Sequence, residues 1–176
     1  MILGVDPGLA NCGWALLERG DLFAHGVIVT KRDKDAKGDT QRRLEDIGRG
    51  LHPYMRRAEL VIVEWPGMGG ARRPGAMNAM AASQTAAAAA MVVGFAWGVG
   101  IKVKAPAAVT WRSKLGHKRG ADAQLHAELA SRYAKNLSGY PQGELPHVLD
   151  AIGLALFGEL VTNPQPRAQL SLAGAP

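Results

Sequence analysis

Four side chains stand at positions where they can do chemistry together. Asp6 and Glu64 each directly follow a short apolar run, and His147 and Asp150 lie three residues apart. Two carboxylates about 4 Å apart repel by roughly 4 kcal/mol at an effective dielectric constant near 20, so a partly buried group must protonate or bind cations. Oxygen ligands with open positions favour Mg²⁺ or Mn²⁺, which also bind water and substrate phosphates. The pattern therefore predicts metal-dependent phosphodiester chemistry.

Each of these residues also has an ordinary structural interpretation. Asp6 opens an Asp-Pro-Gly turn in which its carboxylate can cap the backbone, and Glu64 can be a solvated strand end. Asp150 can be a favourable acid in the first turn of a helix, and His147, beside Pro146, can be a surface residue. The four together favour a site, because two follow strands and two project from one helix face.

Short strands must position the two carboxylates. Runs of branched and apolar residues predict five strands, over residues 2–5, 13–17, 22–30, 59–63 and 101–104. The first three form an antiparallel meander, and the continuous apolar run before Glu64 is typical of a buried central strand. If the strands ending at Asp6 and Glu64 are parallel neighbours, about 4.8 Å apart, their side chains can meet.

Helical spacing predicts four helices around this sheet. They comprise a helix capped by Thr40 and carrying Leu44, Ile47 and Leu51, an Ala-rich helix over about 76–97, a helix over about 122–133, and a last helix from near Pro146 to about 160. The Ala-rich segment contributes little transfer energy, so we expect a buried helix rather than a membrane span. The order predicts an α/β fold, a mixed five-stranded central sheet with helices on both faces.

Composition limits the class of protein. The 176 residues suit one domain, 47% of them are hydrophobic, and the formal net charge of +6 makes a polyanionic partner plausible. Cys12 is the sole cysteine, which excludes an intramolecular disulfide and a zinc site built from several thiolates, and favours a reducing cytosol. The apolar start, residues 1–5, is too short for the core of a signal peptide. We therefore expect a cytoplasmic protein.

Three stretches in order resemble the RuvC family of Holliday junction resolvases. They are Ile2-Leu-Gly-Val-Asp-Pro-Gly-Leu-Ala-Asn-Cys-Gly-Trp-Ala, Val61-Ile-Val-Glu64, and His147-Val-Leu-Asp150-Ala-Ile-Gly-Leu-Ala-Leu. The resemblance covers about residues 1–160, implies a ribonuclease-H-like nuclease domain there, and leaves 161–176, with three prolines, as a disordered tail. Actin-like ATPases and sugar kinases share the Asp-x-Gly turn, but they need a duplicated fold for which this chain is too short.

The resemblance also implies roles for the four site residues. Asp6 is similar to the aspartate that bridges two Mg²⁺, for which Mn²⁺ can substitute, and Glu64 and Asp150 are similar to the acids that complete one metal each. His147 matches a fourth position that is Asp in some relatives and His in others. This histidine softens the site and favours Mn²⁺.

Cations and a wedge are less well matched to the family. Thr110 and Asp122 stand where relatives carry lysines that hold phosphate, so the cation that serves here is open. The candidates for DNA binding are Arg72, Arg73, Lys114, Lys118 and Arg119. Relatives often carry an aromatic wedge after the second carboxylate, and here the candidates are Trp65 and Met68, since apolar wedges can unstack bases. Trp65 can equally be a core residue.

The resemblance implies a function. It is that of a homodimeric crossover junction endodeoxyribonuclease in DNA recombination and repair, which makes paired nicks in four-way or other branched DNA and leaves 5′ phosphates. The family dimerises through the helix after the wedge loop, and the small residues over 76–90 permit close packing there, or equally against the chain's own sheet. The departures suggest a bacteriophage member, although a bacterium or an organelle is equally compatible. Branch-migration machinery is a further candidate partner, for which the sequence shows no docking surface.

Two other functions remain open. A ribonuclease-H-type nuclease that cuts RNA–DNA hybrids would use the same fold. A non-catalytic protein that binds branched DNA would explain the departures near Met68 and Thr110, whereas the intact set of four site residues favours catalysis.

Overall fold

A mixed sheet forms the centre of the protein. The computed structural model describes residues 1–33, 36–66, 79–118 and 120–163. The sheet order is β3-β2-β1-β4-β5, with β1 (Ile2–Asp6), β2 (Asn11–Glu18), β3 (Asp21–Val29), β4 (Leu60–Val63) and β5 (Lys102–Lys104). The first three strands are antiparallel, whereas β1 pairs with β4, and β4 with β5, in parallel. The predicted sheet is confirmed, including the parallel pair that ends at the two carboxylates.

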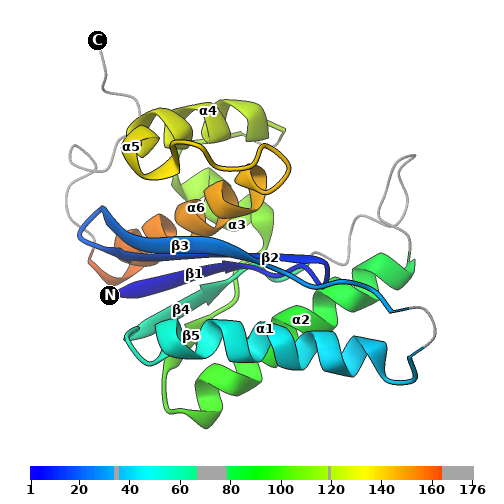
Figure 1. Cartoon of the computed structure of the whole chain (residues 1–176). Coiled ribbons are helices and arrows are strands. Elements are labelled where there is room, and N and C mark those ends of the chain that lie inside the picture. Colours follow the sequence, from blue (N-terminus) through cyan, green and yellow to red (C-terminus); the bar gives the residue numbers. More distant parts are fainter. Residues whose placement is uncertain (34–35, 67–78, 119, 164–176) are drawn as a thin grey trace.

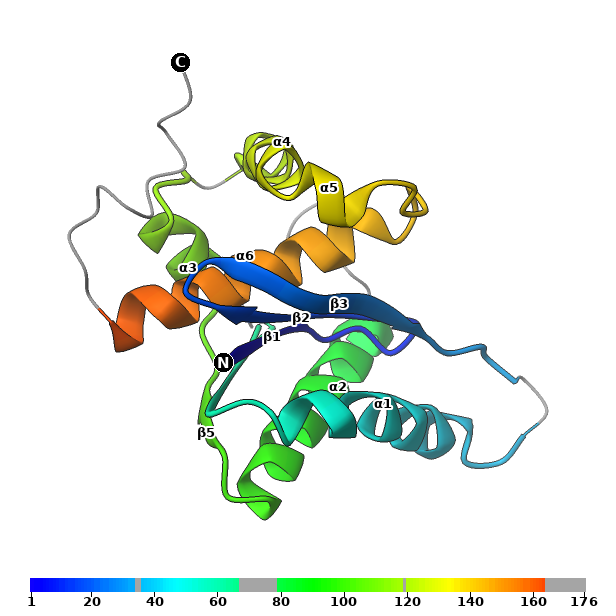
Figure 2. The ribbon, with the colours of Figure 1, turned by 60° about the vertical axis from the view of Figure 1, so that its left-hand side comes forward.

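Helices cover both faces of this sheet. They are α1 (Asp39–Met55), α2 (Ala79–Gly98), α3 (Ala108–Lys114), α4 (Asp122–Arg132), α5 (Ala134–Leu137) and α6 (Leu145–Thr162). In Figure 1, α1 and α2 lie below the sheet, and α3, α4, α5 and α6 lie above it. The rotated view in Figure 2 keeps the same separation. Each face has its own apolar core, one formed with α1 and α2 and the other with α3 to α6.

Glycines allow α6 to lie directly on the sheet. A Cβ at Gly4 in β1 would stand 2.0 Å from the carbonyl oxygen of Ala151, and one at Gly13 in β2 would stand 2.1 Å from that of His147. Such contacts are too short for any side chain, so only glycine permits this approach. The beginning of α6 is thereby held over the ends of β1 and β2.

Three local predictions are wrong. The N-cap of α1 is Gly38, at φ 80°, so Thr40 lies inside the helix, because a left-handed residue turns the chain into it. The connection after Pro106 contains the short helix α3, which the fully buried Trp111 anchors. Finally, α6 continues through Thr162, so residues 161 and 162 of the predicted tail are helical. Residues 164–176 lie outside the described residues.

The predicted burial of the Ala-rich helix holds for one of its faces only. In the described part of α2, only Ala88, Ala89, Val92 and Ala96 are buried, while the side chain of Trp97 is 69% exposed. Residues 76–78 of the predicted helix lie outside the described residues. By length and composition alone, α2 and α6 could each cross a membrane. The buried side chains of α6 belong to one of the two cores, and core helices of this kind pass the same test. Thus α2 packs by one face and leaves the other open.

Candidate active site

Asp6 is paired with His147. Asp6 is the last residue of β1, and His147 is in the first turn of α6, where the close contact at Gly13 holds the helix. The imidazole Nδ1 lies 2.7 Å from Asp6 Oδ2. The hydrogen bond to Asp6 raises the pKa of His147, whereas burial raises the pKa of Asp6 against the effect of this same bond. Both pKa values are therefore raised, so the Asp6–His147 pair retains a proton in its hydrogen bond to higher pH than either side chain would alone.

Glu64 is fixed where β4 ends. Its backbone N–H donates to Val5 O at 3.1 Å, and the next residue, Trp65, donates to Pro106 O at 2.9 Å, which extends the parallel pairing past the strand. The indole Nε1–H of Trp111 donates to Glu64 Oε2 at 2.8 Å. Burial raises the pKa of Glu64 to about 7, although the indole hydrogen bond lowers it. Near neutral pH this carboxyl group is therefore only partly ionised.

Asp150 is in contact with an arginine and a histidine. Its Oδ1 accepts from Arg112 Nη2 at 3.1 Å and lies 3.0 Å from His126 Nε2. Burial pushes the pKa of Asp150 up, but the contacts with His126 and Arg112 together lower it. Among the three acids, Asp150 is therefore the one that ionises readily.

The four predicted site residues lie at one end of the molecule but do not form a single tight cluster. Asp6 and Asp150 are close enough to Glu64 to disfavour its charge, and Asp150 likewise disfavours the charge on Asp6. Among the described residues, no group of three His, Cys, Asp or Glu side chains is positioned to hold one metal ion. Each acid is instead engaged by a protein donor. Three carboxylates and one imidazole are nevertheless suitable ligand types for a divalent cation. Binding of such a cation is favoured because the partly buried acids are not fully neutralised by the protein.

Sequence reasoning missed three neighbours of these acids: Trp111, Arg112 and His126. The aromatic residue and the arginine are on α3, and the histidine is on α4. A Trp-Arg pair in a basic segment was a weak signal, because nothing local shows that it faces Glu64 and Asp150. Among the described residues, Arg112 is the arginine or lysine that contacts a site acid, whereas which cation holds phosphate stays a prediction.

The predicted DNA-binding and wedge residues are only partly described. Lys114 and Lys118 are exposed, and Trp65, next to Glu64, is 40% exposed, so it is not a core residue. Thr110 is exposed, and Asp122, at the other family lysine position, lies 3.2 Å from Arg112 Nε. The remaining candidates, Met68, Arg72, Arg73 and Arg119, lie outside the described residues.

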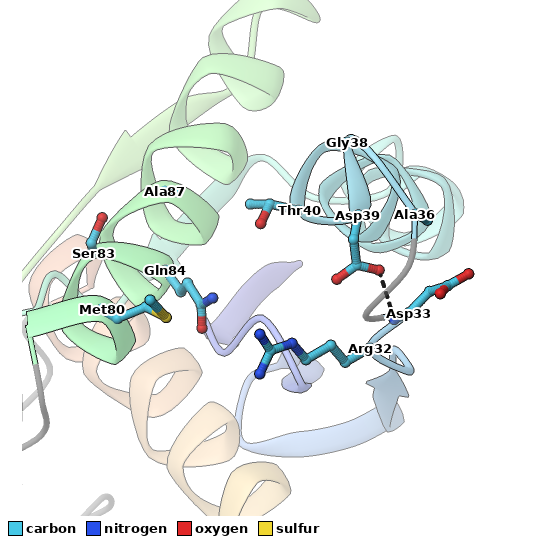
Figure 3. Close-up of a pocket in the computed structure, with 10 residues that line it drawn as sticks. All are labelled: Arg32, Asp33, Ala36, Gly38, Asp39, Thr40, Met80, Ser83, Gln84 and Ala87. Carbon is cyan, nitrogen blue, oxygen red and sulfur yellow. Dashed lines mark hydrogen bonds between the residues drawn. The ribbon is translucent and has the colours of Figure 1, made fainter.

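A hollow of about 520 Å³ lies elsewhere, between α1 and α2 (Figure 3). It is lined by polar side chains that include Arg32, Asp39, Ser83 and Gln84. None of the four predicted site residues lines it, and Asp39 is already engaged by arginines. This hollow is therefore separate from the candidate active site.

The arrangement of strands and helices defines a ribonuclease-H-like fold. Two structures of Thermus thermophilus RuvC share it, each with 21% sequence identity and 93% of this chain covered. The one in complex with a Holliday junction substrate has a TM-score of 0.67 and is covered over 94% of its chain, and the other has a TM-score of 0.65 and 95%.

A third similar structure is Ydc2, the yeast mitochondrial Holliday junction resolvase. Its TM-score is 0.54 at 12% identity, with 96% of this chain and 81% of that chain covered. No protein-family model matches the chain, and no curated protein sequence matches it. The predicted resemblance is thus confirmed at the level of the fold.

Proposed function

We propose that this protein is a metal-dependent DNA endonuclease that resolves four-way junctions. The observation that carries the proposal is that Asp6, Glu64, His147 and Asp150 lie in one region, at the ends of β1 and β4 and the start of α6, with Asp6 and His147 in direct contact. Support comes from the shared fold of a RuvC structure in complex with a Holliday junction substrate. A binding protein without activity would have no need to bury three acids beside one another.

Divalent cations are part of this proposal. Asp6 would lie between two Mg²⁺ or Mn²⁺ ions, Glu64 and Asp150 would each complete one, and His147 would ligate or position water. Such ions supply a nucleophile from water at neutral pH and stabilise the leaving oxygen. The chain's own contribution is to hold the acids, since the Trp111 indole orients Glu64 and burial keeps its pKa raised until a cation binds.

The active form would be a homodimer that nicks opposed strands and leaves 5′ phosphates. The exposed side of α2, which carries small residues and Trp97, supports close packing of two copies. Exposed lysines such as Lys114 and Lys118, with Arg72, Arg73 and Arg119, would bind phosphates, so affinity should fall steeply with salt. Trp65 or Met68 would enter the junction. We place this activity in the cytosol, in DNA recombination and repair, with branch-migration machinery as a candidate partner.

Cleavage of three substrates tests the proposal. A synthetic four-way junction, an RNA–DNA hybrid and a linear duplex are incubated with Mg²⁺ or Mn²⁺ and the wild-type protein, Asp6→Asn, or the distant control Asp46→Asn. We expect paired nicks in the junction from wild type and Asp46→Asn only. Tight junction binding without cleavage would favour a non-catalytic protein, preferential cutting of the hybrid would favour a ribonuclease H, and equal cutting of linear duplex would exclude branch selectivity.

A further inference from the structure

Arg112 occupies a central place in the candidate active site. Its side chain is only 18% exposed, and Nη2 lies 3.1 Å from Asp150 Oδ1. Nε lies 3.2 Å from Asp122 Oδ1, but without hydrogen-bond geometry, so this buried nitrogen has no hydrogen-bond partner among the described residues. The guanidinium is therefore paired with Asp150 and Asp122, donates a hydrogen bond only to Asp150 among the described residues, and keeps unused donor capacity.

The ring of Trp111 packs against the guanidinium. The guanidinium carbon of Arg112 lies 4.6 Å from the centroid of the Trp111 ring, a cation–π arrangement. Trp111 is fully buried, donates to Glu64, and packs so closely on α6 that a Cβ at Gly153 would stand 2.6 Å from its ring. Because Trp111 bonds to Glu64 and its neighbour Arg112 bonds to Asp150, α3 links the acid at the end of β4 to the acid on α6.

The Asp150 carboxylate cannot serve every partner at once. Its Oδ1 already faces both Arg112 and His126, and a divalent ion on the same oxygen would bring like charges together. A guanidinium has a planar fork of donors that suits phosphate as well as carboxylate. Displacement from Asp150 would thus leave Arg112 with donors free beside the acids.

We propose that Arg112 is the resident counter-ion of Asp150, that it competes with divalent cations for this carboxylate, and that once displaced it contacts the scissile phosphate. The second half rests on the proposed nuclease function, whereas the competition does not. The guanidinium thereby keeps the acids compatible with folding before the cation binds. A purely structural ion pair would show no such competition.

Calorimetric titration with Mn²⁺ alone tests the competition. Arg112→Gln removes the charge but retains a planar amide, and Arg49→Gln on exposed α1 is the matched control. We expect Mn²⁺ to bind Arg112→Gln about fivefold or more tightly than wild type, and Arg49→Gln to bind like wild type. Unchanged or weaker binding of Mn²⁺ to folded Arg112→Gln would overturn the competition, as would the absence of Mn²⁺ binding by all three proteins.

Single-turnover cleavage of a four-way junction at saturating Mn²⁺ tests the phosphate contact. We expect Arg112→Gln to cleave about 100-fold more slowly although it binds metal more tightly, since a donor to the developing charge is lost. Cleavage at the wild-type rate would overturn the contact. If wild type cuts no DNA, the nuclease proposal and the phosphate contact fail, but the titration still decides the competition.

Arg112→Lys keeps both tests readable if Arg112→Gln does not fold, as circular dichroism would show. The lysine retains the charge but lacks the planar fork. We expect it to fold, to bind Mn²⁺ with an affinity between those of wild type and Arg112→Gln, and to cleave more slowly than wild type. Wild-type values for both affinity and rate would overturn the role assigned to the guanidinium.

Discussion

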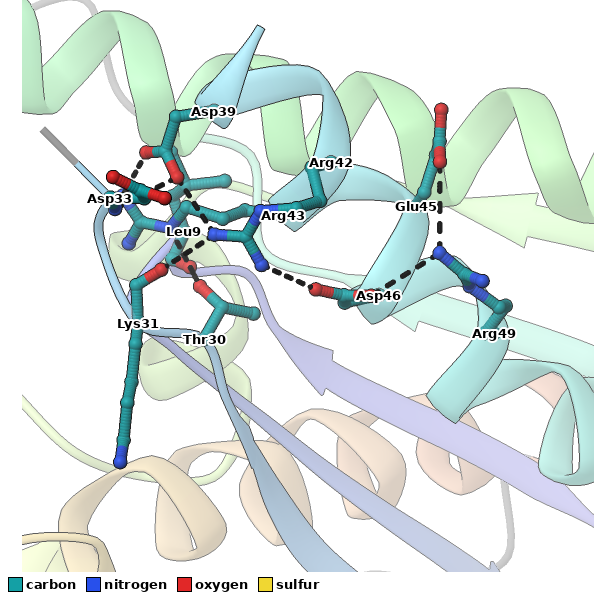
Figure 4. Close-up of polar contacts among 10 residues, drawn as sticks. All are labelled: Leu9, Thr30, Lys31, Asp33, Asp39, Arg42, Arg43, Glu45, Asp46 and Arg49. Carbon is teal, nitrogen blue, oxygen red and sulfur yellow. Dashed lines mark hydrogen bonds and ion pairs between the residues drawn. The ribbon is translucent and has the colours of Figure 1, made fainter. Parts of the chain in front are cut away.

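Two charged clusters of this molecule are built on opposite principles. At the junction of β3 and α1 (Figure 4), Arg42, Arg43 and Arg49 are interleaved with acids of the same helix. The deepest of them, Arg43, is 5% exposed and donates from Nε to Thr30 Oγ1 at 2.8 Å, while that hydroxyl donates to Leu9 O. Each acid shown on this helix has an arginine partner, so charge is matched.

The candidate active site has more acid than base. Three carboxylates lie in one region there, and among the described residues Arg112 is the only arginine or lysine that pairs with one of them, Asp150. Two of the three site acids, Asp6 and Glu64, have raised pKa values, whereas Asp150, like Asp39 of the matched cluster, has a lowered one. A hydrogen bond from the backbone of Asp33, followed by one from Arg42, lowers the pKa of Asp39, whereas burial raises that of Glu64 to about 7. Matched charge is typical of a structural role, and unmatched buried charge is typical of a site that binds cations.

Removing the charge of Asp6 should have the largest effect and tests whether the unmatched acids serve catalysis. Asp6→Asn should lower single-turnover cleavage of a four-way junction by about 100- to 1000-fold, because stabilisation of developing charge is lost. Its free energy of unfolding without metal should not fall, since a buried carboxylate that burial disfavours is replaced by a neutral amide. Quenched-flow cleavage and urea denaturation measure the two quantities. A stable variant that still cleaves would show that Asp6 has only a turn-capping role.

Arg43→Ala, in the matched cluster, should lower stability and leave cleavage unchanged. Loss of the buried guanidinium removes the donor to Thr30 Oγ1 and one of the two arginines paired with Asp39, which should destabilise the protein by roughly 2–4 kcal/mol. Cleavage per folded molecule should stay close to wild type, because Arg43 contacts none of the site acids. Urea denaturation followed by tryptophan fluorescence gives the stability, and active-site titration corrects the rate. A large loss of rate in fully folded Arg43→Ala would mean that the two clusters are coupled, through Leu9 after the Asp6 turn.

Much of the geometry of the candidate site could be predicted because its determinants are local. A carboxylate after a continuous apolar run marks a strand end, and the three-residue spacing of His147 and Asp150 places both on one helix face. Parallel pairing of β1 with β4 then brings Asp6 and Glu64 to one edge. These steps need only strand and helix periodicity.

The role of α3 could not be predicted, because it depends on contacts distant in sequence. The helix has seven residues, too few to show a clear period, and Trp111 acts on Glu64, 47 residues away. The N-cap of α1 was missed for a different reason. Threonine is a good capping residue, but the left-handed Gly38 starts the helix earlier than the pattern indicates.

A pH series sharpens the contrast between the clusters. Because the folded pKa of Glu64, about 7, exceeds its ordinary value of 4.5, the native state binds its proton more tightly than the unfolded state does. Stability of the metal-free protein should therefore fall as pH rises from about 4.5 to about 7. The raised pKa of His147 acts in the same direction above its ordinary value of 6.5.

Thermal denaturation in EDTA and in Mn²⁺ measures this effect. The Tm should fall across the window in EDTA, and Mn²⁺ should reduce the fall because a cation stabilises the ionised carboxylate. Glu64→Gln should flatten the EDTA series, whereas Asp39→Asn should leave the slope in this window unchanged, since the pKa of Asp39 is lowered from 3.8. A Tm in EDTA that rises from pH 5 to 7 would mean that Glu64 is ionised in the metal-free protein.

The smallest effect is expected at the exposed end of the matched cluster. The side chain of Arg49 is 71% exposed and lies 3.3 Å from Asp46 and 3.6 Å from Glu45. Solvent and salt screen such pairs, so Arg49→Ala should change the free energy of unfolding by less than about 0.5 kcal/mol. Urea denaturation at low and high salt, beside Arg43→Ala, measures the difference. If Arg49→Ala were as destabilising as Arg43→Ala, charge matching rather than burial would determine stability at this junction, and the two ends of the cluster would act as one unit.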